Sequence, residues 1–363
     1  MRLSIFSTLL LFLISAIAVY SIVPLIPSLS KELHTSITTL ALVVSLGWIG
    51  GAIGGLIMGA LSDSYGRRIS LFVSVLLFGI GTLISYFISN VYFLFVTWFI
   101  VGFGVNGENG ISYAIVAESL KSGRGSIGGF MQGLYFAGYL LSLLFALTHY
   151  SLLLIGLLSL VLSPLSFTIQ ETRGRRGVSP FSNFSELDIK IAIITSILAI
   201  SAFLYTVPFV SLIPTLFEID KINYDLLLIA SALGIFFYAL SGYISDIIGR
   251  KRTSIILSVV ALIASLIFLF SLYDKNLLVV STFTVFLGSS FFSYLGVWIS
   301  ELYPPKMRGT GTNLSFLVGR IIGGGFGVTL VTLLPFTLGM NMSVMLIICS
   351  ILAIISSMMS RDL

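Results

Sequence analysis

The chain has 363 residues, of which 57% are hydrophobic and only 9% are charged, and its mean hydropathy is +1.11. That is too little charge to cover a soluble globule of this length, so a soluble enzyme or binding module is excluded and a polytopic membrane protein is expected. The formal net charge of +5 would by itself fit a nucleic-acid partner, but the basic residues gather in loops between apolar runs.

Twelve apolar runs are long enough to cross a bilayer, which takes about 20 mostly apolar residues in a helix. The first run, from Leu3 to Leu29, is too long for a signal-peptide core and lacks a small-residue cleavage pattern, so it is interpreted as the first span. Six spans fall in each half of the chain. The runs start near residues 3, 38, 69, 91, 126, 149, 189, 224, 253, 276, 310 and 338.

Alternate loops carry most of the basic residues. If even-numbered spans return to the starting side, the opposite side has only Lys31, Lys221 and Lys275. By the positive-inside rule the basic side is cytoplasmic, and both termini lie there. We therefore expect an integral protein of the cell (plasma) membrane without a nucleic-acid partner. The basic side holds Arg2, Arg67, Arg68, Lys121, Arg124, Arg173, Arg175, Arg176, Lys190, Arg250, Lys251, Arg252, Lys306, Arg308 and Arg361.

Two loop sequences recur half a chain apart. Gly59-Ala-Leu-Ser-Asp63-Ser-Tyr-Gly66-Arg67-Arg68 follows span 2, and Gly242-Tyr-Ile-Ser-Asp246-Ile-Ile-Gly249-Arg250-Lys251 follows span 8. The spacing from Asp63 to Asp246 equals the spacing from Glu118 to Glu301. Parallel repeats of membrane helices are typical of transporters. The predicted organisation is a six-helix bundle at residues 1–169, a polar cytoplasmic linker at 170–188 and a second six-helix bundle at 189–363.

These features resemble the major facilitator superfamily over essentially the whole chain. Glu301-Leu-Tyr-Pro304-Pro-Lys-Met-Arg308-Gly309 after span 10 is similar to the Glu-x-x-Pro-x-x-x-Arg-Gly motif of sugar porters and related symporters. Glu118-Ser-Leu-Lys-Ser-Gly-Arg124-Gly125 after span 4 looks like a degraded copy, without the proline and one residue. The resemblance implies an all-α fold of twelve transmembrane helices in two pseudo-repeats and transport by alternating access.

The charged loops have two readings. Arg67 and Arg68 follow a tight turn, where they can reach a carboxylate at a neighbouring helix end, such as Glu118. The second copy repeats this arrangement with Asp246, Arg250, Lys251 and Glu301. The favoured interpretation is a cytoplasmic gate that holds the outward-open state and parts when the halves rock. The alternative is a solvated ionic surface that only anchors topology. The gate set is Asp63, Arg67, Arg68, Glu118, Arg124, Asp246, Arg250, Lys251, Glu301 and Arg308.

Two ionisable residues lie deep in apolar spans, Glu108 in span 4 and Arg320 in span 11. Such groups cost ~2.5 to 3.5 kcal/mol each to insert and usually mark function. Their repeat equivalents, Phe291 and Ala137, carry no charge. The two charged residues therefore serve something other than the scaffold that both copies share. At about 1.5 Å per residue both lie roughly 15 to 18 Å from the cytoplasmic edge, near the midplane where such proteins bind cargo.

Other polar residues accompany these charges. Gly104-Val-Asn106-Gly107-Glu108-Asn109-Gly110 resembles the Gly-Gly-Glu stretch of helix 4 in metabolite:proton symporters, and Phe130-Met-Gln132-Gly133 a helix 5 stretch of the same transporters. Gly319-Arg320-Ile-Ile-Gly323 looks like helix 11 of aromatic-acid and organic-ion transporters. The candidate substrate or proton site is Glu108, Arg320, Gln132, Asn106, Asn109 and Asn313. The amides among them have a competing role as hydrogen-bonding contacts between helices.

The resulting hypothesis is a secondary active transporter that imports a small polar or anionic metabolite (an organic acid, sugar or phosphate) with protons. Its partners are this small molecule, protons and the lipid bilayer, and the protein is expected to be a monomer. No metal cluster, nucleophilic triad or phosphate loop is found, so we expect no enzyme activity, no cofactor and no ATP-driven pump. A drug or metabolite efflux antiporter, a passive facilitator and a non-transporting receptor remain alternatives.

Overall fold

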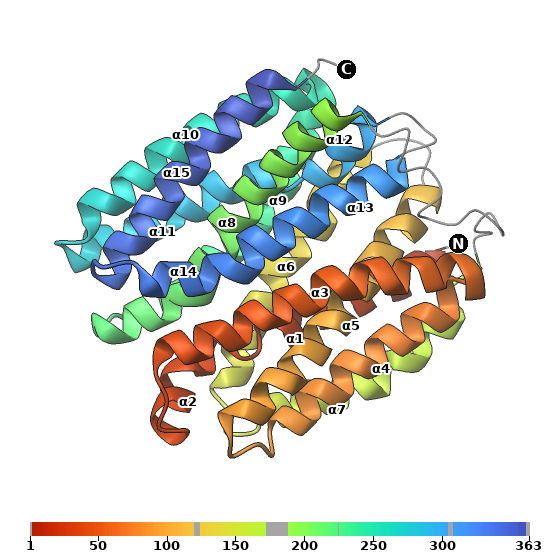
Figure 1. The fold of residues 1–363 in the computed structure, drawn as a ribbon, viewed down its shortest axis with the longest axis horizontal. Coiled ribbons are helices and arrows are strands. Elements are labelled where there is room, and N and C mark those ends of the chain that lie inside the picture. The colour runs from red at the N-terminus through yellow and green to blue at the C-terminus, as the bar shows by residue number, and fades with distance from the viewer. Residues whose placement is uncertain (1, 120–123, 172–187, 224, 304–307, 361–363) are drawn as a thin grey trace. The chain divides into compact units, whose positions relative to one another are not determined.

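The computed structural model describes residues 2–119, 124–171, 188–223, 225–303 and 308–360, and all regular structure in these ranges is helical. η1, η2 and η4 are 3₁₀ turns and η5 is a π-helix. The elements are α1 (Arg2–Tyr20), η1 (Val23–Leu25), α2 (Ile26–Glu32), α3 (Ile37–Tyr65), α4 (Arg67–Ser85), α5 (Val91–Ser119), α6 (Arg124–Ala146), α7 (Ser151–Leu162), η2 (Ser163–Thr168), α8 (Ile189–Ile219), α9 (Asp225–Ile248), α10 (Arg250–Ser271), α11 (Lys275–Gly288), η4 (Ser289–Phe292), α12 (Leu295–Leu302), α13 (Arg308–Gly319), η5 (Arg320–Phe326), α14 (Gly327–Leu333) and α15 (Leu338–Met359) (Figure 1).

Within the described ranges, twelve helical segments are long and apolar enough to cross a membrane, which confirms the predicted spans. Four of these spans are not continuous α-helices. Span 1 changes to η1 at Pro24, span 6 ends in η2, span 10 is interrupted by η4, and span 11 by the π-helix η5. Departures from regular helix geometry often occur at functional sites, because they free backbone groups and re-aim side chains.

Contacts divide the chain into two compact units. The first is Met1–Arg124 with Ala137–Ser185, and the second is Gly125–Phe136 with Glu186–Leu363. The first half of α6 therefore belongs to the second unit. The predicted linker lies mostly at residues 172–187, outside the described residues, so the boundary at 170–188 stays a prediction.

A glycine with positive φ ends span 2 and span 8. Gly66 has φ 100° and ψ 157°, and Gly249 has φ 92° and ψ 151°. These are dihedrals that residues with a Cβ rarely adopt, so each glycine lets the chain reverse between two helices without a longer loop. The repeated sequence thus produces the same backbone turn twice, before α4 and before α10.

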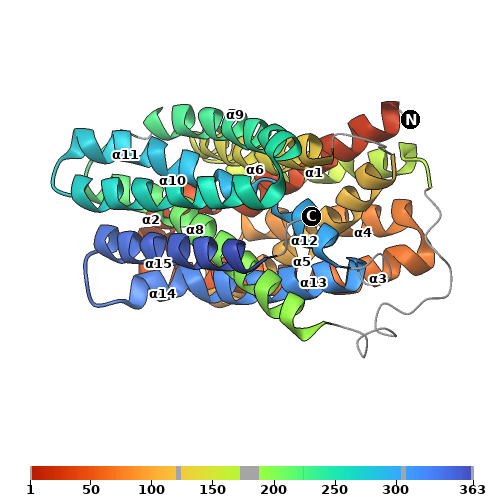
Figure 2. The ribbon, with the colours of Figure 1, turned by 90° about the horizontal axis from the view of Figure 1, so that it is seen from above.

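Helices pack through small residues and hydroxyl pairs. A Cβ on Gly102 of α5 would collide with the backbone of Gly47 on α3, so these two helices approach as closely as glycine allows. α10 and α15 run side by side (Figures 1 and 2), and the hydroxyls of Ser254 and Ser357 lie 2.8 Å apart between them. Such contacts hold helices together where lipid removes the hydrophobic drive for association.

Candidate functional site

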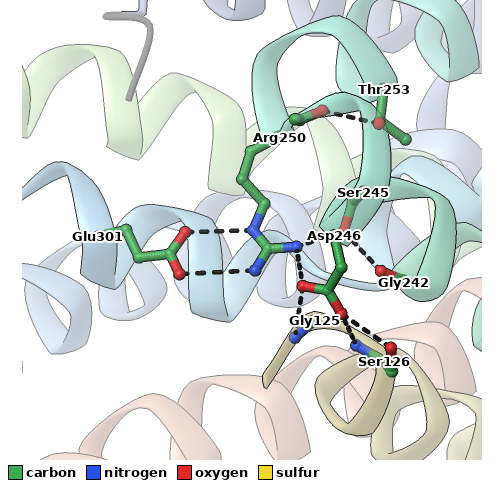
Figure 3. A network of polar contacts seen from close by, with 9 residues as sticks. Gly125, Ser126, Gly242, Ser245, Asp246, Arg250, Thr253 and Glu301 are labelled. Carbon is green, nitrogen blue, oxygen red and sulfur yellow. Dashed lines mark hydrogen bonds and ion pairs between the residues drawn. The ribbon is translucent and has the colours of Figure 1, made fainter. Parts of the chain in front are cut away.

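The turn before α10 carries an ion-pair cluster in the second unit (Figure 3). Arg250 Nη1 lies 2.8 Å from Asp246 Oδ1, and Arg250 donates to both oxygens of Glu301, from Nε at 3.1 Å and from Nη2 at 3.5 Å. Its Nη1 also donates to the Ser245 hydroxyl at 2.6 Å. The Arg250 side chain is only 12% exposed. Two-pronged pairing of this kind fixes geometry as well as charge.

The Asp246 carboxylate also caps the start of another helix. It accepts hydrogen bonds from the backbone N–H groups of Gly125 at 3.2 Å and Ser126 at 2.8 Å, and from the Ser126 hydroxyl at 2.8 Å (Figure 3). The first N–H groups of a helix have no partner within it, and a negative charge there is favoured by the helix dipole. Asp246 of α9 therefore ties the first turn of α6 to the Arg250 cluster.

We expect Asp246→Ala to lower the free energy of unfolding by about 2 kcal/mol, because it removes both a cap and an ion pair. Asp274→Ala is the matched control, since Asp274 only caps its own helix, accepting from Asn276 N at 2.8 Å and Leu277 N at 3.2 Å. That control should cost about 1 kcal/mol. Unfolding in detergent measures the free energy of unfolding of both variants. If the two variants lose the same amount, Asp246 contributes no more than an ordinary helix cap.

The first unit repeats part of this cluster with a different carboxylate. Arg67 Nη1 donates to the Ser62 hydroxyl at 2.6 Å, as Arg250 does to Ser245. The Glu171 carboxylate accepts the backbone N–H of Arg67 and, at 3.3 Å, that of Arg68. Arg68 Nε donates to the carbonyl of Ile169. The first turn of α4 is therefore capped by the residues that follow span 6.

Sequence reasoning missed Glu171, which it treated only as part of the linker. The available signal was a carboxylate directly after an apolar span, two residues before a run of arginines. Nothing in the sequence shows that this carboxylate reaches a turn 104 residues earlier.

Replacing Glu171 with alanine should expose the first turn of α4 to solvent exchange. Amide hydrogen exchange of the segment after Gly66 should accelerate about tenfold, since a charged cap on a helix N-terminus is lost. The segment after Gly249 is the internal reference, because it forms the same glycine turn and α10 has no side-chain cap from its own cap residue. Equal exchange in wild type and Glu171→Ala at the α4 turn would contradict the cap.

Several predicted site residues have side chains outside the described part of the structure. Lys251 is half-buried in the first turn of α10, next to Arg250. The side chains that are not described are those of Asp63, Glu118, Arg124, Arg308 and Asn313.

Glu108 is fully buried inside the first unit, on α5. Its Oε2 accepts a hydrogen bond from Ser15 of α1 at 2.8 Å, and its Oε1 accepts one from Ser112, one turn further along α5. Asn109 Oδ1 lies 3.3 Å from the same Ser15 hydroxyl. The structure thus brings Glu108 and Asn109 together around a serine that sequence reasoning did not single out.

The other amides lie in different surroundings. Asn106 packs over Gly51 of α3, where a Cβ would collide with its amide group, and its Nδ2 donates to Gly102 O at 3.3 Å. This placement suits a contact between helices. Gln132 is half-buried on the part of α6 that belongs to the second unit.

Arg320 opens the π-helix η5 in the second unit. Its guanidinium carbon lies 5.9 Å from the ring centroid of Phe203 on α8 and 5.6 Å from that of Phe316 on α13. Phe203 also packs against Phe292 of η4, with centroids 4.9 Å apart. Aromatic faces attract a cation, more strongly where water is excluded. The charge thus lies over rings contributed by spans 7 and 11.

Together these features place a buried carboxyl group in one helical unit and a cation among aromatic rings in the other. With twelve spans and two copies of one turn, they define a polytopic helical membrane transporter, driven by gradients rather than by nucleotide. The chain belongs to the major facilitator superfamily: the profile described as Major Facilitator Superfamily matches residues 8–328. It is an integral membrane transporter of small molecules, not an enzyme.

Individual relatives are more distant. The chain is 26% identical over 350 residues to the sialic acid transporter NanX of Escherichia coli K12, covering 89% of this chain and 84% of that protein. It is 27% identical over 313 residues to the probable 4-methylmuconolactone transporter of Cupriavidus pinatubonensis, covering 79% and 72%. The putative niacin/nicotinamide transporter NiaP of Bacillus subtilis is 25% identical over 338 residues, covering 85% and 82%.

Solved structures share the fold. The inward-open xylose transporter XylE of E. coli superimposes with a TM-score of 0.80 over 99% of this chain and 96% of that one, at 16% sequence identity. The predicted family and fold are therefore confirmed.

Proposed function

We propose that this protein imports a small carboxylate-bearing metabolite together with protons, by alternating access. Glu108 takes up and releases the coupling proton, and Arg320 binds the carboxylate of the substrate. The observation that carries the proposal is the placement of Glu108: a carboxyl group without any exposed surface, whose side-chain partners are hydroxyls. A structural carboxylate at such depth would be expected to have a cationic partner, because an unpaired buried charge is costly.

The surroundings of Arg320 support the second half of the proposal. A ring face compensates the charge of a guanidinium but does not reproduce the two parallel acceptors of a carboxylate. The relatives are named after sialic acid, 4-methylmuconolactone and niacin, which each carry a carboxyl group, and the third also after nicotinamide, which carries an amide instead. A carboxylate is thus common to most of these compounds, and it is the group that a deep arginine recognises best.

We also propose that the Asp246–Arg250–Glu301 cluster is the gate predicted from the repeat. Its contacts with the first turn of α6 are charge-assisted but partly exposed, so they can break and re-form during a transport cycle. The basic loops support a cytoplasmic position for this gate and for both chain termini.

A ligand screen followed by liposome transport tests the function. Purified protein is melted with sialic acid, nicotinate, 4-methylmuconolactone, xylose and phosphate, and binding raises the midpoint by mass action. The compound that stabilises the protein is then offered to liposomes with and without an inward proton gradient. Accumulation that requires the gradient supports symport.

Two other results of this transport experiment would identify a different type of transporter. Transport that only equilibrates the compound, whatever the gradient, identifies a passive facilitator. Loss of preloaded substrate against its gradient while protons enter identifies an efflux antiporter.

A further inference from the structure

The Ser15 hydroxyl on α1 lies among three oxygen atoms. It is 2.8 Å from the carbonyl of Phe12, 2.8 Å from Glu108 Oε2 and 3.3 Å from Asn109 Oδ1. A serine hydroxyl has one hydrogen to donate, so it donates to one of these oxygens at a time. A proton on Glu108 supplies a second hydrogen: the carboxylic acid then donates to Ser15, while Ser15 donates to Phe12. Binding of the proton and the contact between α1 and α5 therefore depend on each other.

The two hydroxyls that touch Glu108 differ in what holds them there. Ser112 lies on α5 itself, so it moves with Glu108. Ser15 belongs to α1, which packs against α5, so its bond is broken whenever these two helices separate. Of these two hydrogen bonds, the one from Ser15 is therefore the one that changes when the helices rearrange.

Burial makes the same helix contact a barrier to protons. Glu108, Ser15 and Ser112 have no exposed surface, and Asn109 has 1%. Among the described residues, the side chains that hydrogen-bond to Glu108 are the uncharged hydroxyls of Ser15 and Ser112. A proton thus reaches or leaves Glu108 only when the helices around it move.

We propose that Ser15 is a positioning residue of the proton site: it holds the Glu108 carboxyl group closed while the proton is bound, and separation of α1 from α5 opens the site for release. This inference rests on the proposed role of Glu108. It assigns the coupling step to a contact inside the first unit, apart from the carboxylate contact of Arg320 in the second.

The test compares Ser15→Ala with Ser142→Ala in liposomes. Ser142 is a matched control, because it is equally buried in the first unit and its hydroxyl bonds a carbonyl three residues back, Tyr139 O at 2.7 Å, with no carboxyl group nearby. Uphill accumulation of substrate is measured at a series of pH values from acidic to alkaline. Each value is divided by the rate of substrate exchange between equal pools, which corrects for the amount of active protein. Ser15→Ala should displace the pH at half-maximal accumulation by about one unit, the size expected for a hydrogen bond worth ~1.4 kcal/mol. Ser142→Ala should leave it in place.

Infrared difference spectra supply a second measurement that does not depend on transport. The C=O band of protonated Glu108, identified by its loss in Glu108→Gln, should shift in Ser15→Ala and not in Ser142→Ala. If Ser15→Ala behaves like Ser142→Ala in both measurements, Ser15 has no positioning role, while Glu108 keeps its own. If Glu108→Gln still accumulates substrate uphill, the proposed proton site is wrong, and the role of Ser15 is rejected with it.

Discussion

We expect Glu108→Gln to abolish accumulation driven by a proton gradient, reducing it to the level of protein-free liposomes. Glutamine keeps the size of the side chain, and it can accept from one of Ser15 and Ser112 and donate to the other, but it cannot cycle a proton. Among the described residues deep in the spans, Glu108 is the one carboxyl group, so no equivalent side chain replaces it. Exchange of labelled substrate between equal pools should persist, because it moves no net proton.

The control for this experiment is Glu32→Gln, which makes the same chemical change on an exposed residue at the end of α2. It should leave accumulation intact. If uphill transport persists in liposomes with Glu108→Gln, Glu108 is not the residue that carries the coupling proton. That result would point to another proton carrier, or to coupling through the carboxyl group of the substrate itself.

Arg320→Lys should raise the KM for a carboxylate substrate about tenfold, which corresponds to ~1.4 kcal/mol of binding. Lysine keeps the positive charge but loses the planar fork that pairs with both carboxylate oxygens. It also stacks less well between the rings of Phe203 and Phe316. Initial uptake rates as a function of substrate concentration give KM and kcat separately.

Arg252→Lys provides the matched control, since Arg252 is exposed in the first turn of α10. It should leave KM as in the wild type. If the best substrate is a neutral sugar and Arg320→Lys does not change its KM, then Arg320 is structural and the proposed carboxylate contact is wrong. In that case the effect of Arg320→Lys should appear in the melting temperature instead.

The gate residues show how far sequence reasoning reaches. Matching Glu301 with Arg250 needed only the repeat and the rule that charges at neighbouring helix ends pair. The hydrogen bond from Ser126 N–H to Asp246 could not be predicted in this way. A helix N-terminus attracts any nearby carboxylate, and the sequence does not show which carboxylate lies there. The same holds for Glu171 at the start of α4.

The sequence by itself determined the spans, the repeat, the two glycine turns and the identity of the deep charges. Each depends on a local property: hydropathy over one helix length, the positive φ of one glycine, or the cost of one ionisable group in lipid. These properties do not change with the way the helices pack.

Only the tertiary structure decided which partners surround those charges. Ser15 could not be selected from the sequence, because most of the buried serines that the structure describes bond a carbonyl on their own helix, as Ser142 and Ser159 do. Whether such a serine also meets a carboxyl group depends on the rotation of α1 about its axis and on its approach to α5. The rings of Phe203 and Phe316 meet Arg320 for the same reason. Apolar residues occur all around these spans, so hydropathy carries no information about which face turns inward.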